Sequence, residues 1–365
     1  MPEQLLVLLH GVGPHPPGWS AEAVAALDAA AAKFDAFRGG PAFSARLTVA
    51  EVAYADCFEE IVDGWQQQSA GFAAWSRANG GALPDVVRWL DATLPASEAS
   101  AKEFFWSTAS HALLYRGFAL VRDRVRLRVM ARLVEILRDV GAQGAAVTLV
   151  AHGLGAVVLH DVLDMLGTGR VPPDVGDASM LAAGSWTASS VFMIADACLL
   201  GPAALRDVDY LDSVCGPVGG GRPGMCQRFF EVWHAFDPLA VTQPFRPADW
   251  GRNYREIGPL THFRRANVHA LGHYLDHPAV HVPLVNQALG GPVIDAAEAA
   301  AARGAYPDVV APACLTEIEE LKAKARSFDG AGEDLGALVA RLAELYALAR
   351  HAAEECEGLA KGLVS

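Results

Sequence analysis

The sequence predicts an α/β protein built on a mostly parallel sheet. Short apolar segments rich in β-branched or aromatic residues occur at 5–9, 145–150, 190–195 and 229–233, and they suit strands buried on both faces. Helix-periodic segments separate them, an alternation typical of parallel sheets with crossover helices. The hydrophobic content of 52% is sufficient for a large core.

The first elements follow in a regular order. The strand at 5–9 leads into His10, and Ser20 then has the residue type and the position of an N-cap for a helix over 21–34. Residues 43–54 alternate well enough for a second strand.

A helical, aromatic-rich insertion at 56–121 interrupts the core before the next strand. We expect it to pack on the core as a helical cap; the alternative, compatible with the first, is a lid that shapes a substrate pocket. The helix that follows, at 122–139, carries arginines that we expect to face solvent. A membrane-surface role for this helix is the less favoured alternative.

Residues 147–155 read V-T-L-V-A-H-G-L-G, a buried strand running into a tight turn and a helix. In the pattern G-x-S-x-G, this turn exposes a nucleophilic serine. Gly153 occupies the serine position. Glycine tolerates the strained backbone of such a turn, but it has no atom that can attack a substrate. An ordinary glycine-rich turn is the alternative interpretation.

Two further segments favour a catalytic origin for the turn. The strand at 229–233 continues to Asp237, which precedes a proline and lies where the acid of a catalytic triad would be. A histidine-rich segment at 268–280 comes next. The order of nucleophile position, acid and histidine is that of α/β-hydrolases, and it differs from the orders in chymotrypsin and subtilisin.

On these motifs, residues 4–290 resemble the α/β-hydrolase superfamily, in particular its lipase- and esterase-like serine hydrolases. The motifs are H-G-x-G at 10–13, the turn at 151–155, F-D-P-L-A at 236–240 and G-H-Y at 272–274. The departure from the family is the glycine at the nucleophile position.

The resemblance implies a role for each matching residue. It implies an oxyanion hole from the backbone amides of Val12 and Leu154, with Asp237 as the acid and His273 as the general base. It also implies substrate contacts by His10, Gly11 and His152. No cofactor is implied.

A metal site is not expected. His269, His273, His277 and His281 recur every four residues, a spacing that binds metal on a continuous helix, but Gly272 and Pro278 interrupt it. The six cysteines form no C-x-x-C pair.

Charge and organisation limit the other function classes. A net charge of −13 argues against nucleic-acid binding, which depends on positive charge. With neither a signal-like N-terminus nor a long apolar run, we expect a cytoplasmic protein. We expect a hydrolase core at 1–290, including the insertion at 56–121, and a helical C-terminal extension at 291–365. The oligomeric state is not indicated.

The sequence therefore favours a serine hydrolase-like protein of the esterase or lipase type, with a small-molecule or lipid ester as its ligand. Because Gly153 replaces the nucleophile, we expect it to be inactive, as a natural pseudoenzyme or an engineered inactive variant. Slow hydrolysis by a water molecule in place of the serine is a weaker hypothesis. The alternative is a non-catalytic ligand-binding or scaffolding protein on the same fold.

Overall fold

The computed structural model describes residues 4–67, 111, 114–115, 118–141, 145–176, 178–182, 184–196, 214–219, 223–235, 237, 250–262, 268–306 and 323. Most of the expected insertion at 56–121 lies outside the described residues. So does almost all of the expected C-terminal extension beyond residue 306.

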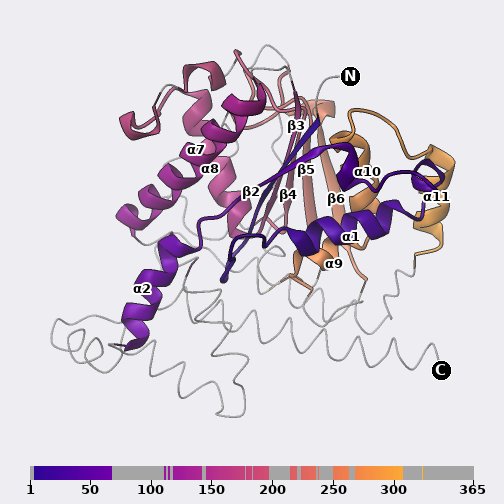
Figure 1. Cartoon of the computed structure of the whole chain (residues 1–365), viewed down its shortest axis with the longest axis horizontal. Coiled ribbons are helices and arrows are strands. Elements are labelled where there is room, and N and C mark those ends of the chain that lie inside the picture. Colours follow the sequence, from indigo (N-terminus) through magenta and orange to yellow (C-terminus); the bar gives the residue numbers. More distant parts are fainter. Residues whose placement is uncertain are drawn as a thin grey trace.

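Within the described residues, six strands form one sheet in the order β2-β1-β3-β4-β5-β6 (Figure 1). Every pairing is parallel. The strands are β1 (Gln4–Leu9), β2 (Thr48–Val52), β3 (Ala146–His152), β4 (Ser190–Ile194), β5 (Phe229–His234) and β6 (Tyr254–Leu260). The α/β class and the parallel sheet expected from the sequence are confirmed.

The chain reverses its direction of winding at the centre of the sheet. It passes from β1 to β2 on one side and then crosses to β3 on the other. In open parallel sheets, such a reversal leaves a crevice at the carboxyl ends of the two strands, where ligands typically bind. His10 follows β1 and Gly153 follows β3 at this edge.

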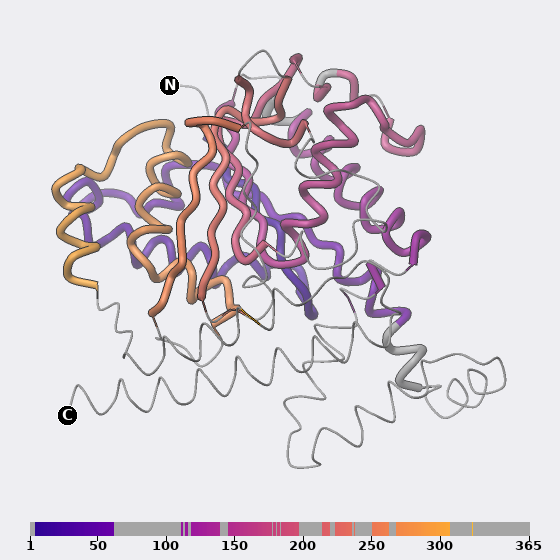
Figure 2. The backbone as a smooth tube through the Cα atoms, turned by 180° about the vertical axis from the view of Figure 1, so that it is seen from behind, coloured from indigo at the N-terminus to yellow at the C-terminus, as the bar shows by residue number. Residues whose placement is uncertain are grey.

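Helices cover both faces of the sheet (Figures 1 and 2). One face carries α7 (Ala119–Gly141) and α8 (Leu154–Gly167), with α2 (Asp56–Gln67) beside α7. The other carries α1 (Ala21–Ala31), α9 (Leu271–Leu275), α10 (Pro278–Ala288) and α11 (Ala296–Gly304).

Strand β1 shows how the sheet separates two apolar layers. Leu5, Val7 and Leu9 join the core beneath α7 and α8, while Leu6 and Leu8 join the core beneath α1 and α10. Successive side chains of a strand point to opposite faces, so a strand covered on both sides must be apolar throughout. No described helix is long and apolar enough to cross a membrane.

Ser20 is the N-cap residue of α1, which begins at Ala21 as expected, but its side chain makes no capping hydrogen bond. Ser20 already has helical backbone angles, and its hydroxyl donates to a carboxylate oxygen of Glu51 at 2.8 Å. The backbone N–H groups of Gly18 and Ser20 also donate to Glu51. A carboxylate from the end of β2 therefore accepts the bonds of this turn.

Strand β6 was missed from the sequence, and the strand expected at 43–54 is shorter. β6 carries Arg255, Glu256 and a Gly258–Pro259 pair, which do not resemble a buried strand. It pairs only with β5 in the described sheet, and an edge position tolerates charge and proline. Residues 44–46 form a short 3-10 turn before β2.

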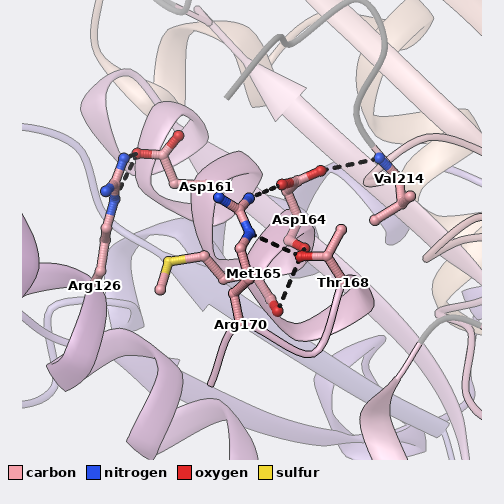
Figure 3. Close-up of polar contacts among 7 residues, drawn as sticks. All are labelled: Arg126, Asp161, Asp164, Met165, Thr168, Arg170 and Val214. Carbon is pink, nitrogen blue, oxygen red and sulfur yellow. Dashed lines mark hydrogen bonds and ion pairs between the residues drawn. The ribbon is translucent and has the colours of Figure 1, made fainter. Parts of the chain in front are cut away.

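The arginine-rich helix α7 faces solvent only in part. Arg126 is buried and donates through Nε to Asp161 of α8 at 2.9 Å (Figure 3). The Tyr115 hydroxyl donates to the same carboxylate oxygen at 2.6 Å. Farther along α8, Asp164 pairs with Arg170 and accepts the backbone N–H of Val214. The expectation of a solvated arginine face is therefore wrong for Arg126.

Candidate active site

Gly153 lies at the turn between β3 and α8, with φ of 55° and ψ of −121°. Residues other than glycine adopt this backbone at a cost. The Gly153 N–H donates to the carbonyl oxygen of Ile194 at 2.8 Å, which fixes the turn to the end of β4. This is the strained strand-to-helix turn expected from the sequence.

The turn is packed directly against the loop that follows β1. A Cβ atom added to Gly155 would lie 2.2 Å from the carbonyl oxygen of His10, so only glycine fits there. A Cβ atom added to Gly153 would lie 3.8 Å from the Cα of Gly11. Val12 and Leu154, the expected oxyanion donors, are therefore in adjacent segments, as the two halves of an oxyanion hole need to be.

The His10 side chain stabilises the loop that follows β1. Its Nδ1 nitrogen donates to the carbonyl of Gly11 at 2.7 Å, and its Nε2 nitrogen accepts the backbone N–H of Tyr54 at 3.0 Å. Burial, followed by the nearby charge of His15, lowers the pKa of His10 to about 3, so the ring stays neutral. These contacts hold the His10 ring in the core, and the substrate contact expected of it stays a prediction.

One described residue of the insertion also contacts this loop. The backbone N–H of Gly13 donates to Nδ1 of His111 at 3.3 Å, and the His111 ring stacks on Phe58. Most of the expected lid lies outside the described residues, so the lid interpretation stays a prediction.

An aspartate and a histidine, Asp237 and His269, pair beside the turn at Gly153. Asp237 follows β5 and is fully buried, and its Oδ2 oxygen accepts the Nδ1–H of His269 at 2.8 Å. A Cβ atom added to Gly153 would lie 3.1 Å from Nε2 of the same ring. The imidazole therefore bridges the buried carboxylate and the position where a nucleophile would stand.

His273, the expected general base, lies elsewhere. It is fully buried in α9, and its Nε2 nitrogen donates to the carbonyl oxygen of His262 at 2.9 Å. Helix α9 begins at Leu271, so His273 is part of the helix, whereas His269 belongs to the preceding turn and can face the sheet edge. The expected pairing of His273 with Asp237 is corrected to His269, four residues earlier.

Two residues hold the acid and the base. The Tyr274 hydroxyl donates to Oδ2 of Asp237 at 2.6 Å, and burial, followed by the Asp237 charge, raises the pKa of Tyr274 well above its usual value. His152 donates through Nε2 to the backbone carbonyl of His269 at 2.7 Å, and the substrate contact expected of it stays a prediction. Burial, followed by His269, lowers the pKa of His152 to about 3. Gly11 is needed at this point, because a Cβ there would lie 2.8 Å from the His152 ring.

Three buried imidazoles lie behind this pair, and we call His234, His262 and His273 the histidine cluster. One ring nitrogen from each lies within 4.8 Å of the others. Each Nε2 nitrogen donates to a backbone carbonyl: His234 and His273 to His262, and His262 to His273. Burial, followed by His273, lowers the pKa of His234 to about 3 and that of His262 to about 2.

The geometry of the histidine cluster fits a hydrogen-bonded support better than a metal site. The rings of His262 and His273 are stacked 4.2 Å apart at an angle of only 4°. Ring lone pairs lie in the ring plane, so two parallel stacked rings cannot both point at one ion at the usual distance of about 2.1 Å. The carbonyl contacts tie the end of β5, the end of β6 and α9 together.

The sequence matches no model of a known protein family and no curated protein, and the fold matches no solved structure. The geometry of the site is therefore the basis on which a function can be inferred.

Proposed function

We propose that the chain is an α/β-hydrolase-type protein of the esterase or lipase class that binds a small-molecule or lipid carboxylic ester and does not turn it over. One observation carries the proposal: the Asp237–His269 pair is directed at Gly153, in a turn whose backbone suits a nucleophile. The chain order of Gly153, Asp237 and His269 is that of the α/β-hydrolases.

The chemistry of a serine hydrolase explains why these residues would remain together. A serine hydroxyl attacks the ester carbonyl, an imidazole takes its proton, a carboxylate orients the imidazole, and backbone amides stabilise the oxyanion. This chain has candidates for every part except the hydroxyl. The imidazole would be His269, the carboxylate Asp237, and the backbone amides those of Val12 and Leu154. Both a natural pseudoenzyme and an engineered inactive variant fit this arrangement.

The test is to supply the missing hydroxyl with Gly153→Ser. The unmodified protein should show little or no hydrolysis of short p-nitrophenyl esters, since loss of a triad nucleophile removes about 10⁴- to 10⁶-fold of rate. Gly153→Ser should hydrolyse them. Because the new Cβ would lie 3.1 Å from Nε2 of His269, the ring must retreat by a few tenths of an ångström.

A second change identifies the base. Gly153→Ser combined with His269→Ala should return to background. The matched control is Gly153→Ser combined with His281→Gln, since His281 is also buried but bonds to the Leu275 carbonyl and not to Asp237. That control should keep its activity.

The same close contact favours a second candidate, a binding or scaffolding protein that never uses the site for catalysis. The His269 ring lies so near Gly153 that it partly occupies the room a side chain would need. If Gly153→Ser folds, binds an ester analogue and hydrolyses nothing across a range of acyl lengths, this second candidate replaces the first.

A further inference from the structure

Two hydroxyl or imidazole donors meet on one oxygen of Asp237, and only one of them is explained by the proposed acid–base pair. The His269 Nδ1–H reaches Oδ2 at 2.8 Å, and the Tyr274 O–H reaches the same oxygen at 2.6 Å. The Asp237 side chain is fully buried. A buried carboxylate is costly unless hydrogen bonds compensate for its lost hydration, so both donors contribute to keeping it in place.

Tyr274 is itself held firmly. It is fully buried in α9, next in sequence to His273 of the histidine cluster. His273 bonds and stacks with His262 beyond β6, and His262 also accepts a bond from His234, three residues before Asp237. The cluster therefore joins the segment that carries Tyr274 to the segment that carries Asp237, and the distance between hydroxyl and carboxylate is set by the core.

A second donor on the same oxygen has a definite physical effect. Rotation of the Asp237 carboxylate would move Oδ2 away from His269, and the Tyr274 bond opposes that rotation. The bond also disperses negative charge from Oδ2, which leaves the shared proton on Nδ1 of His269. The opposite ring nitrogen then keeps the lone pair that faces residue 153.

We propose that Tyr274 is a positioning residue for the Asp237–His269 pair, with its hydroxyl fixing the carboxylate that aims His269 at residue 153. A positioning role has a catalytic purpose only if the proposed function holds, but the first test of this inference needs no catalytic activity. Tyr274 is fully buried, and it acts through its hydrogen bond to Asp237.

The chain contains a matched control. The Tyr115 hydroxyl donates to Oδ2 of Asp161 at 2.6 Å, also between fully buried side chains, but in the layer of α7 and α8. Tyr115→Phe and Tyr274→Phe therefore remove the same kind of bond at the same length. A merely structural role predicts that both changes lower stability and leave the His269 proton unaffected.

The measurement is proton NMR of the Nδ1–H between His269 and Asp237, assigned by its loss in His269→Gln. In Tyr274→Phe, Oδ2 becomes a stronger acceptor, so the signal should move further downfield; in Tyr115→Phe it should stay in place. An unchanged signal in folded Tyr274→Phe, or an equal shift in both variants, would overturn the inference. If Tyr274→Phe does not fold, the test uses the unmodified protein. The His269 Nδ1–H and the Tyr274 O–H point at one oxygen, so their signals should show a cross-relaxation peak. Absence of that peak would overturn the inference.

A second arm uses the Gly153→Ser background. There Tyr274→Phe should lower kcat by about tenfold or more with little change in KM, the loss expected from one hydrogen bond to a charged group. Tyr115→Phe should leave both constants unchanged once the protein is folded. If Gly153→Ser is inactive, the proposed function fails, while the NMR arm still tests Tyr274 separately.

Discussion

Two buried aspartates in this chain each accept a tyrosine hydroxyl, but their second partners differ. Asp161 and Asp237 each accept a tyrosine hydroxyl at 2.6 Å. Asp161 then pairs with Arg126, whereas Asp237 pairs with His269. An arginine is always charged, so the first pair is a fixed ion pair, whereas the second pair joins a carboxylate to an imidazole. Of the two carboxylates, only Asp237 orients an imidazole that lies beside the turn at Gly153.

Acid should have the largest effect, and it should destabilise the region around Asp237 more than the region around Asp161. The pKa values of His10, His152 and His234 are lowered to about 3 and that of His262 to about 2, mainly by burial. The unfolded chain protonates these histidines below about pH 6.5 while the folded chain does not, so stability is present above that pH and falls as the pH drops toward 3. Each histidine that is protonated only in the unfolded chain lowers the free energy of unfolding by about 1.4 kcal/mol per pH unit below pH 6.5. For four histidines the loss is about 5 kcal/mol at pH 5.5.

The check is chemical denaturation at pH 7.5 and 5.5, with hydrogen exchange by mass spectrometry at both. Exchange should rise in β5 and α9 and change least in α7 and α8, beside Arg126 and Asp161. Equal protection of both regions at pH 5.5 would contradict the comparison.

Removing one member of the fixed ion pair should have the next largest effect. Asp161→Asn leaves the Arg126 guanidinium buried without its counter-charge, and we expect the free energy of unfolding to fall by about 3–5 kcal/mol. Urea denaturation would measure it. The exposed Arg128–Asp56 pair of the same helix is the control, because Asp56→Asn should change stability by about 0.5 kcal/mol or less.

The same substitution at the other aspartate should cost less. Asp237→Asn keeps a carbonyl oxygen that can accept from Tyr274 and His269, and it leaves no buried cation behind. We expect a loss of about 1–2 kcal/mol, well below that of Asp161→Asn. If the two variants lost equal stability, the distinction between an arginine partner and an imidazole partner would have no energetic basis.

The smallest effect concerns the turn that the acid–base pair faces. Gly153→Ala should lower stability by about 1 kcal/mol, because alanine must adopt a φ of 55°. The new methyl group also requires His269 to shift slightly. A crystal structure of the variant should show the His269 ring displaced and still bonded to Asp237. Breakage of that bond would show that the pair has less room than proposed.

The parts of the molecule that the sequence could predict are those with a local pattern. Four of the strands are short and largely apolar, and β2 lies in a segment that alternates. The turn at 151–155 combines a buried strand with closely spaced glycines, a pattern that the sequence shows directly. Strand β6 has no such pattern, because its edge position relaxes the need for apolar residues.

The choice between His269 and His273 could not be made from the sequence. Both lie in one histidine-rich segment, four residues apart, and the start of α9 between them decides which ring faces the sheet edge. Tyr274 was part of a noted motif, but its hydroxyl contact depends on where α9 meets β5. Arg126 resembles its neighbouring arginines until the position of Asp161 on a distant helix is known.

The contact between Gly155 and His10 has a consequence for any ligand. The segment after β1 and the start of α8 meet here through backbone atoms, because no Cβ atom fits between Gly155 and the His10 carbonyl. Their spacing is therefore established when the sheet forms. A ligand that bound at this edge would find both segments already in place, so binding should involve little loss of backbone conformational entropy there.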